Sequence, residues 1–261
     1  MPTSSFLRRS VTQGLFVLTV LVLWAFASLH SSTETFMPPP WVVAQAFWQF
    51  LVSGELFWKM YFTLQAIAMG LLISLVLAAL LNTMAFLSVR AAYGVELITT
   101  IMHPMPSVAM IPLVIIWVGI GFQGTVALTV NSCLWPLLLN SYTGFRAVHK
   151  TYLEVGRNIG LRGVHLIRAV MIPASLPYLL AGLKVAWARS WRTVVAAEMV
   201  FGTTSQSEGI GWFIFEALQY VDFSQILSGI LVIIIVGVLM ERGFFETLER
   251  HTIVKWGMAR Q

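Results

Sequence analysis

The sequence has few of the residues on which soluble domains and most enzymes depend. It contains one cysteine, Cys133, which excludes an internal disulfide and a multi-cysteine metal site. Only 10% of its 261 residues are charged, whereas a soluble domain of this size carries about 25%. It also has no Gly-x-x-x-x-Gly-Lys-Ser/Thr nucleotide-binding loop, no Ser-His-Asp arrangement in a loop and no carboxylate pair in a polar segment. These absences argue against an enzyme.

Long apolar runs make up most of the sequence. Hydrophobic residues make up 58% of the chain, and the mean hydropathy is +0.82. An α-helix of about 20 apolar residues crosses the roughly 30 Å hydrocarbon core of a bilayer. The runs predict an all-α integral membrane protein with one transmembrane domain over residues 1–261 and six spanning helices, at about 14–30, 61–86, 93–118, 125–142, 176–201 and 226–245.

Lysine and arginine indicate the orientation of these helices, because both residues are enriched in cytoplasmic loops. With both termini in the cytoplasm, most of the sixteen lysines and arginines lie inside, only Lys59 lies outside, and the rest belong to the fifth run. The net charge of +5 is therefore assigned to membrane orientation and not to nucleic acid. A signal peptide cleaved near Ala25-Phe26-Ala27 is the alternative to a retained first helix.

Two shorter stretches are predicted to lie along the outer membrane interface. A helix at 41–51 places four residues on one face and is too short to span the bilayer; these are Trp41, Ala44, Trp48 and Leu51. The stretch 209–220 is expected to form a second interfacial helix or a partly re-entrant one.

Prolines interrupt the third run at positions 104, 106 and 112, and Gly119 and Gly121 follow it as a tight outer turn. Proline is tolerated at membrane depth where neighbouring helices or a cavity satisfy the freed carbonyl groups. We therefore expect the third helix to face the protein interior.

Residues 151–173 form a basic loop between two apolar runs, which predicts a cytoplasmic position. Thr151 and Glu154 have the spacing of a capping box, and Gly160 is a place where a first short helix can end. A second short helix is expected to turn one apolar face inward before Pro173 and Pro177 interrupt it. That face consists of Val164, Ile167 and Met171, and the cations in or just before the loop are Arg146, Lys150, Arg157, Arg162 and Arg168.

This loop resembles the signature of permease subunits in binding-protein-dependent ABC importers. The family pattern is Glu-Ala-Ala, three residues, Gly, nine residues, Ile, one residue and Leu-Pro. The corresponding residues here are Glu154, Gly160, Val170, Ile172 and Pro173, while Val155 and Gly156 replace the two alanines. Two more segments, 103–121 and 188–211, are similar to the third span and to the fifth span with its outer loop in permeases for nitrate, sulfonates and taurine. Glu198, Gly209 and Gly211 stand at family-like places in the latter.

The resemblance implies a type I importer permease fold, in which segment 151–173 is a coupling helix that inserts into a groove on an ATP-hydrolysing subunit. The residues implied in coupling are Thr151, Glu154, Arg157, Gly160, Leu161 and Pro173. It further implies two ATP-binding subunits that hold ATP and Mg, a second permease copy as a homodimer or a similar chain, a solute-binding protein and a bacterial inner membrane. The expected solute is a nitrate-, sulfonate- or taurine-like anion or a related small organic compound.

Charged and aromatic residues within the spans are candidates for the translocation path, because charge at membrane depth is costly. They are Glu96, His103, Trp187, Trp191, Arg192 and Glu198. A structural reading competes, in which Arg189 and Arg192 pair with Glu96 or with backbone carbonyls, Lys184 extends to the inner interface and Glu198 lies near the outer one. His103 has no second ligand at metal-binding spacing, so no metal site is expected.

Two other functions are open at this point. A secondary transporter would use Glu96, His103 and Glu198 as a proton relay, and its uptake would depend on the proton gradient. A membrane anchor or assembly subunit would have no path of its own.

Overall fold

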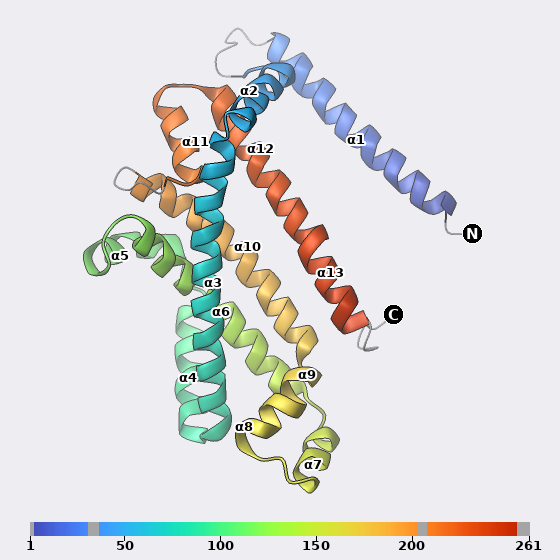
Figure 1. The fold of residues 1–261 in the computed structure, drawn as a ribbon, viewed down its shortest axis with the longest axis vertical. Coiled ribbons are helices and arrows are strands. Elements are labelled where there is room, and N and C mark those ends of the chain that lie inside the picture. The colour runs from blue at the N-terminus through green and yellow to red at the C-terminus, as the bar shows by residue number, and fades with distance from the viewer. Residues whose placement is uncertain (1–2, 31–36, 203–207, 255–261) are drawn as a thin grey trace. The chain divides into compact units, whose positions relative to one another are not determined.

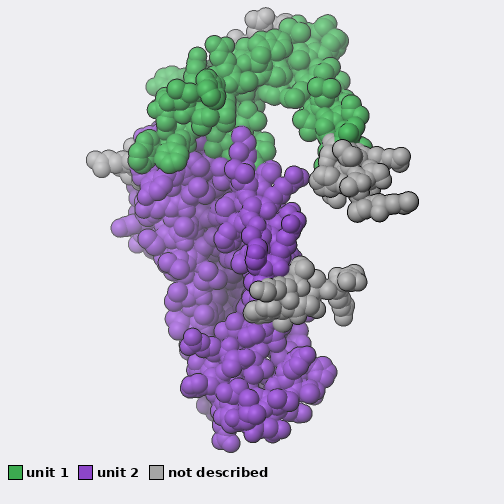
Figure 2. Space-filling view, turned by 45° about the vertical axis from the view of Figure 1, so that its right-hand side comes forward, with its two compact units in different colours: residues 1–58, 213–234 green, residues 59–212, 235–261 purple. Residues whose placement is uncertain are grey.

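A computed structural model describes residues 3–30, 37–202 and 208–254, and Figure 1 shows helices throughout these residues, with no strand among them. The chain divides into two compact units, residues 1–58 with 213–234 and residues 59–212 with 235–261 (Figure 2). Two parts of the predicted topology lie outside the described residues, namely positions 203–207 of the outer loop and the C-terminal tail from 255 onward.

The first unit contains α1 (Thr3–His30) and α2 (Pro40–Val52), together with most of α11 (Ile210–Gln219) and the first part of α12 (Phe223–Leu239). The helix predicted at 41–51 is confirmed as α2, which buries Val43 and leaves the predicted tryptophan face exposed. The ring of Phe50 meets that of Phe213 edge to face, with centroids 5.1 Å apart. The short helix predicted after position 209 is confirmed as α11.

The second unit contains the remaining helices, except that the first four residues of α3 belong to the first unit. They are α3 (Glu55–Leu87), α4 (Val89–Met102), η1 (Ser107–Met110), α5 (Ile111–Trp117), α6 (Phe122–Ala147), α7 (Lys150–Asn158), α8 (Gly163–Leu166), η2 (Ile167–Met171), α9 (Ile172–Ala174) and α10 (Leu176–Phe201). The chain ends through η4 (Met240–Phe245), α13 (Glu246–Glu249) and η5 (Arg250–Val254). α6 and α10 pack closely because Gly182 has no side chain where the Cβ of Asn140 approaches; a Cβ at Gly182 would lie 2.8 Å from it.

Four helices among the described residues are long and apolar enough to cross a membrane, namely Val11–His30, Glu55–Leu87, Phe122–Ala147 and Phe223–Ile253. Two bent helix pairs raise the number to as many as six if each pair is one span. All six predicted runs overlap these helices. That all six cross the membrane stays a prediction.

The third run is not one continuous helix. α4 and the η1–α5 pair meet at an angle of 93°, because Pro104 and Pro106 have no N–H to continue the helical hydrogen bonds. The tight turn predicted after it is confirmed, since Gly119 and Gly121 have φ values of 96° and 93°.

Segment 151–173 forms two short helical stretches, as predicted, and Gly160 with φ of 88° separates them. The predicted capping box is wrong. The N-cap of α7 is His149, whose Nδ1 accepts a hydrogen bond from Thr151 N at 3.4 Å. Thr151 therefore lies inside the first turn.

The apolar face predicted for the second stretch is only partly correct. Ile167 and Met171 are buried, but Val164 is 55% exposed. Val164 is the second residue of the four-residue helix α8, at the N-terminal end of the element, whereas Ile167 and Met171 lie in the π-helix that follows it.

Candidate functional site

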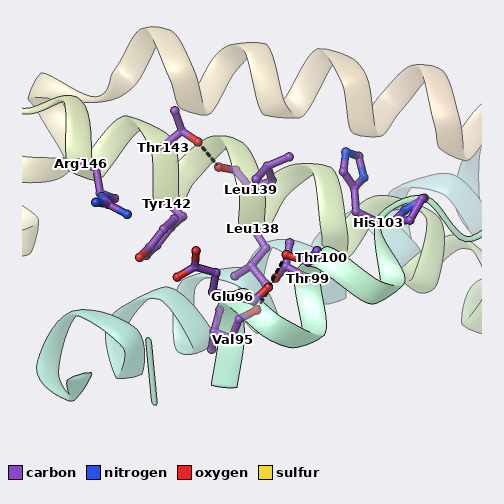
Figure 3. A pocket seen from close by; sticks show the side chains of 11 residues that line it. Val95, Glu96, Thr99, Thr100, His103, Leu138, Leu139, Tyr142, Thr143 and Arg146 are labelled. Atoms are coloured by element: carbon purple, nitrogen blue, oxygen red, sulfur yellow. Dashed lines mark hydrogen bonds between the residues drawn. The ribbon is translucent and has the colours of Figure 1, made fainter. Parts of the chain in front are cut away.

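A cavity of about 580 Å³ lies between α4 and α6 in the second unit. α4 contributes Glu96 and Thr99, His103 follows at the end of this helix, and α6 contributes Tyr142 and Arg146 (Figure 3). Glu96 and His103 are seven residues apart, two helical turns, and therefore lie on the same side of α4. The structure thus brings together these two predicted path residues.

The threonine hydroxyl groups of the cavity donate hydrogen bonds within their own helices. Thr99 Oγ1 donates to Val95 O at 2.6 Å, and Thr100 Oγ1 donates to Glu96 O at 2.8 Å. The Glu96 carboxylate forms no ion pair among the described residues, and Figure 3 shows it directed toward Tyr142 across the cavity. The charged groups therefore have more capacity than the threonine hydroxyls to contact a solute here.

Arg189 of α10 contacts one end of this cavity through His103. Its Nη1 lies 3.3 Å from His103 Nδ1 and 3.3 Å from the backbone oxygen of His103. A guanidinium group only donates hydrogen bonds, so His103 Nδ1 accepts in this arrangement. Pairing of Arg189 with a backbone carbonyl, one of the structural alternatives, is confirmed.

Glu198 lies in a separate, buried cluster. Its side chain accepts hydrogen bonds from Thr63 Oγ1, at 2.8 Å and 3.0 Å for the two oxygens, and from Gly211 N at 2.9 Å. Ile210 N in turn donates to Thr63 Oγ1 at 2.9 Å. A Cβ on Gly209 would collide with the Glu198 carboxylate. The three family-like residues Glu198, Gly209 and Gly211 therefore belong to one hydrogen-bonded unit at the start of α11.

The remaining predicted path residues lie elsewhere in the helix bundle. Trp187 and Trp191 stack with centroids 5.9 Å apart, and both pack against the buried cluster of Ala66, Ile67 and Val194. Arg192 is exposed. Neither the tryptophans nor Arg192 line the cavity between α4 and α6, and a role for them in the path stays a prediction.

Some residues of these sites were missed by the sequence reasoning. Tyr142 and Arg146 lie four residues apart on α6, and the Arg146 guanidinium carbon lies 5.7 Å from the centre of the Tyr142 ring. This i, i+4 spacing was a signal that could have indicated the pair. Thr63 gave no such signal, because one threonine in an apolar run is unremarkable. Lys59, in the second turn of α3, pairs with Glu208 at 2.5 Å. It was the one lysine or arginine predicted to lie outside, which was an indication of a partner.

Segment 151–173 presents an apolar surface beside its cations. Tyr152 and Val155 of α7 and Ile159 directly after it are exposed, and they line a groove of about 530 Å³ with Val170 and Pro173. Thr151, Glu154, Arg157 and Gly160 are exposed and Leu161 is half-buried. The groove and its rim can accept a helix or loop of another protein.

Several apolar helices long enough to cross a membrane, together with a partly charged cavity between two of the helices, are typical of polytopic transport proteins. The chain belongs to the family of binding-protein-dependent transport system inner membrane components, whose model matches residues 70–242. It is thus a multi-pass membrane permease of the ABC importer type, a transport protein and not an enzyme.

Curated relatives cover most of the chain at low identity. The taurine transport system permease protein TauC of Escherichia coli K12 is 27% identical over 94% of this chain and 90% of its own length. The nitrate import permease protein NrtB of Leptolyngbya laminosa is 27% identical over 90% and 85%. The bicarbonate transport system permease protein CmpB of Synechococcus elongatus is 26% identical over 90% and 86%.

Proposed function

We propose that this chain forms the translocation path for a small anion and that separate subunits supply the energy from ATP. One observation carries the proposal. α6 lines the cavity and then leads through Val148 and His149 directly into α7, the first helix of segment 151–173. A force applied to α7 would therefore be transmitted along α6 to the wall of the cavity.

The partners follow from the surface of this segment and from the family. Two ATP-binding subunits, which hold ATP and Mg, would receive α7 on the cytoplasmic side, with its exposed apolar residues in their groove and its charged residues at the rim. A second permease copy would complete the membrane part, and a solute-binding protein would deliver the solute from outside. Six crossings with both termini in the cytoplasm would place the segment on the ATPase side.

The proposed solutes are nitrate, bicarbonate, taurine or related sulfonates, which the relatives' names give. Two cations near the cavity support an anion. Arg146 lines it, and Arg189 reaches His103 at its other end.

The test is uptake by the complete complex in proteoliposomes, with labelled nitrate, bicarbonate and taurine as probes and ATP inside. The wild type should import one of them with ATP. Gly160→Val and Glu154→Lys should insert normally but hydrolyse ATP without uptake, because the first strains a position with φ of 88° and the second reverses a charge on the docking surface.

Full uptake by both variants would refute the assigned coupling role. Uptake that requires a proton gradient and ignores ATP would refute the importer and favour a secondary transporter. No uptake of any probe in an active, correctly inserted complex would refute the proposed solutes.

A further inference from the structure

A second cavity, of about 340 Å³, adjoins the first along α6. Its walls come from the end of α3, the start of α4, the end of α6, α7 and η2. Tyr142 and Arg146 line both cavities. We propose that the second cavity is an inner anion-binding chamber of the translocation path, which a solute enters between Tyr142 and Arg146; this rests on the transport function proposed above.

The charged residues that line the two cavities indicate that an anion binds more favourably in the second cavity than in the first. The first cavity has Glu96 as well as Arg146, so a carboxylate opposes the cation. The second has Arg146 and Lys150, with no acidic residue among those that line it. An anion that leaves the first cavity therefore moves away from a negative charge and toward a second positive one.

Arg146 is suited to bind a solute at the junction. It is exposed, and it forms no ion pair within the described residues. Its contact there is the face of the Tyr142 ring, at 5.7 Å from the guanidinium carbon. An anion can compete with the ring for the guanidinium group without breaking a salt bridge, and the guanidinium can bind a carboxylate-like or sulfonate-like group through two N–H groups.

The inner chamber also has contacts with the moving part of the proposed mechanism. Leu153 of α7 and Met171 of η2 lie in its wall, so a displacement of segment 151–173 would change its shape. Asn82 Nδ2 donates to Ser141 Oγ at 2.6 Å, which ties α3 to α6 beside the chamber. The volume of the inner chamber, about 340 Å³, is within the range of about 300–1,000 Å³ that is usual for small-molecule sites. The chamber is the place from which ATP-driven motion of α7 would release the anion.

Charged thiol reagents test the chamber without any need for transport. Cys133 is fully buried, so the wild-type chain is the blank. Ala92→Cys places a thiol in the inner chamber, and Thr143→Cys places one in the first cavity alone. The rates of modification by an anionic reagent, sulfonatoethyl methanethiosulfonate, and by its trimethylammonium counterpart are measured in the purified complex.

The ratio of anionic to cationic rates should be about 10-fold higher at Ala92→Cys than at Thr143→Cys. Adding Arg146→Gln and Lys150→Gln should abolish the difference. Arg168→Gln, which removes an exposed cation of the same loop that does not line the chamber, should leave it unchanged. Equal ratios at the two positions, or an equal effect of Arg168→Gln, would overturn the proposal.

Uptake separates this inference from the proposed function. Arg146→Gln should lower taurine or nitrate uptake about 10-fold, and Arg146→Lys, which keeps the charge but not the paired N–H groups, should lower it less than Arg146→Gln does. Wild-type import combined with equal thiol-reagent ratios would refute the chamber alone. A clear anionic preference in a complex that imports nothing would refute the transport function instead.

Discussion

At the residue scale, Glu198 shows how a buried carboxyl group is accommodated in this protein. The side chain is 7% exposed, and an ionised carboxylate at such a position is costly unless hydrogen bonds compensate for the lost water. Thr63 and Gly211 supply them. Because Gly209 and Gly211 leave room for the carboxylate, the start of α11 is fixed to α3 and α10 through these few contacts.

Replacing Thr63 by Val should destabilise the protein by about 1–3 kcal/mol, because the carboxylate of Glu198 and the N–H of Ile210 both lose a buried partner. The measurement is thermal unfolding of the purified chain in detergent. Thr83→Val is the matched control, since Thr83 lies in the same helix and donates only to the Ala79 carbonyl within it. Equal unfolding temperatures of the two variants would contradict this account.

The sequence was informative about some of these residues and silent about others. Glu198, Gly209 and Gly211 were identifiable through the family pattern, and Arg189 through the cost of its charge in a span. Their partners were not identifiable, because Thr63 and Glu198 lie 135 positions apart and His103 and Arg189 lie 86 apart. Contacts at such separations depend on how helices pack, which no local pattern records.

At the element scale, the apolar runs determined where helices form, but not where they bend. The prolines after α4 indicated an interruption without indicating the angle of 93°. The π-helix at 167–171 also escaped prediction, because an extra residue per turn leaves no sign in apolar spacing.

Gly156 determines how closely α7 packs on the following helices. A Cβ there would lie 2.7 Å from Leu166 Cδ1 and 3.1 Å from Val170 Cγ2. Gly156→Val should therefore displace α7 and cost about 1–3 kcal/mol, measured by thermal unfolding and by protease sensitivity of the loop. Leu166→Ala in the same chain should recover part of the loss, because it opens the space that the new side chain requires.

The control for this pair is Gly94→Val, since nothing lies within 4 Å of a Cβ at Gly94. If Gly94→Val lowered the stability as much as Gly156→Val does, the destabilisation would come from the low helix propensity of valine and not from packing.

At the scale of the whole molecule, the sequence predicted the family and a multi-pass membrane protein better than the path of each segment through the bilayer. Hydropathy and length identify four helices that are long and apolar enough to cross a membrane. A count of six requires that each of the two bent helix pairs is one span. The distribution of cations supports six. Bends are set by proline and by neighbouring helices together, so composition alone cannot distinguish a broken span from a re-entrant loop.

Cysteine labelling at three positions of the second unit distinguishes a broken span from a re-entrant loop. Val89→Cys, Ile120→Cys and Ile159→Cys replace exposed side chains before the bent pair, after it and after α6. With a membrane-impermeant maleimide, the first and third should react from the cytoplasmic side and the second from the outside. The wild-type chain, with buried Cys133, is the blank. If Ile120→Cys reacted from the same side as Val89→Cys, the pair α4 and η1–α5 would be re-entrant. α6 would then carry Ile159 to the opposite side, and segment 151–173 could not meet an ATPase in the cytoplasm.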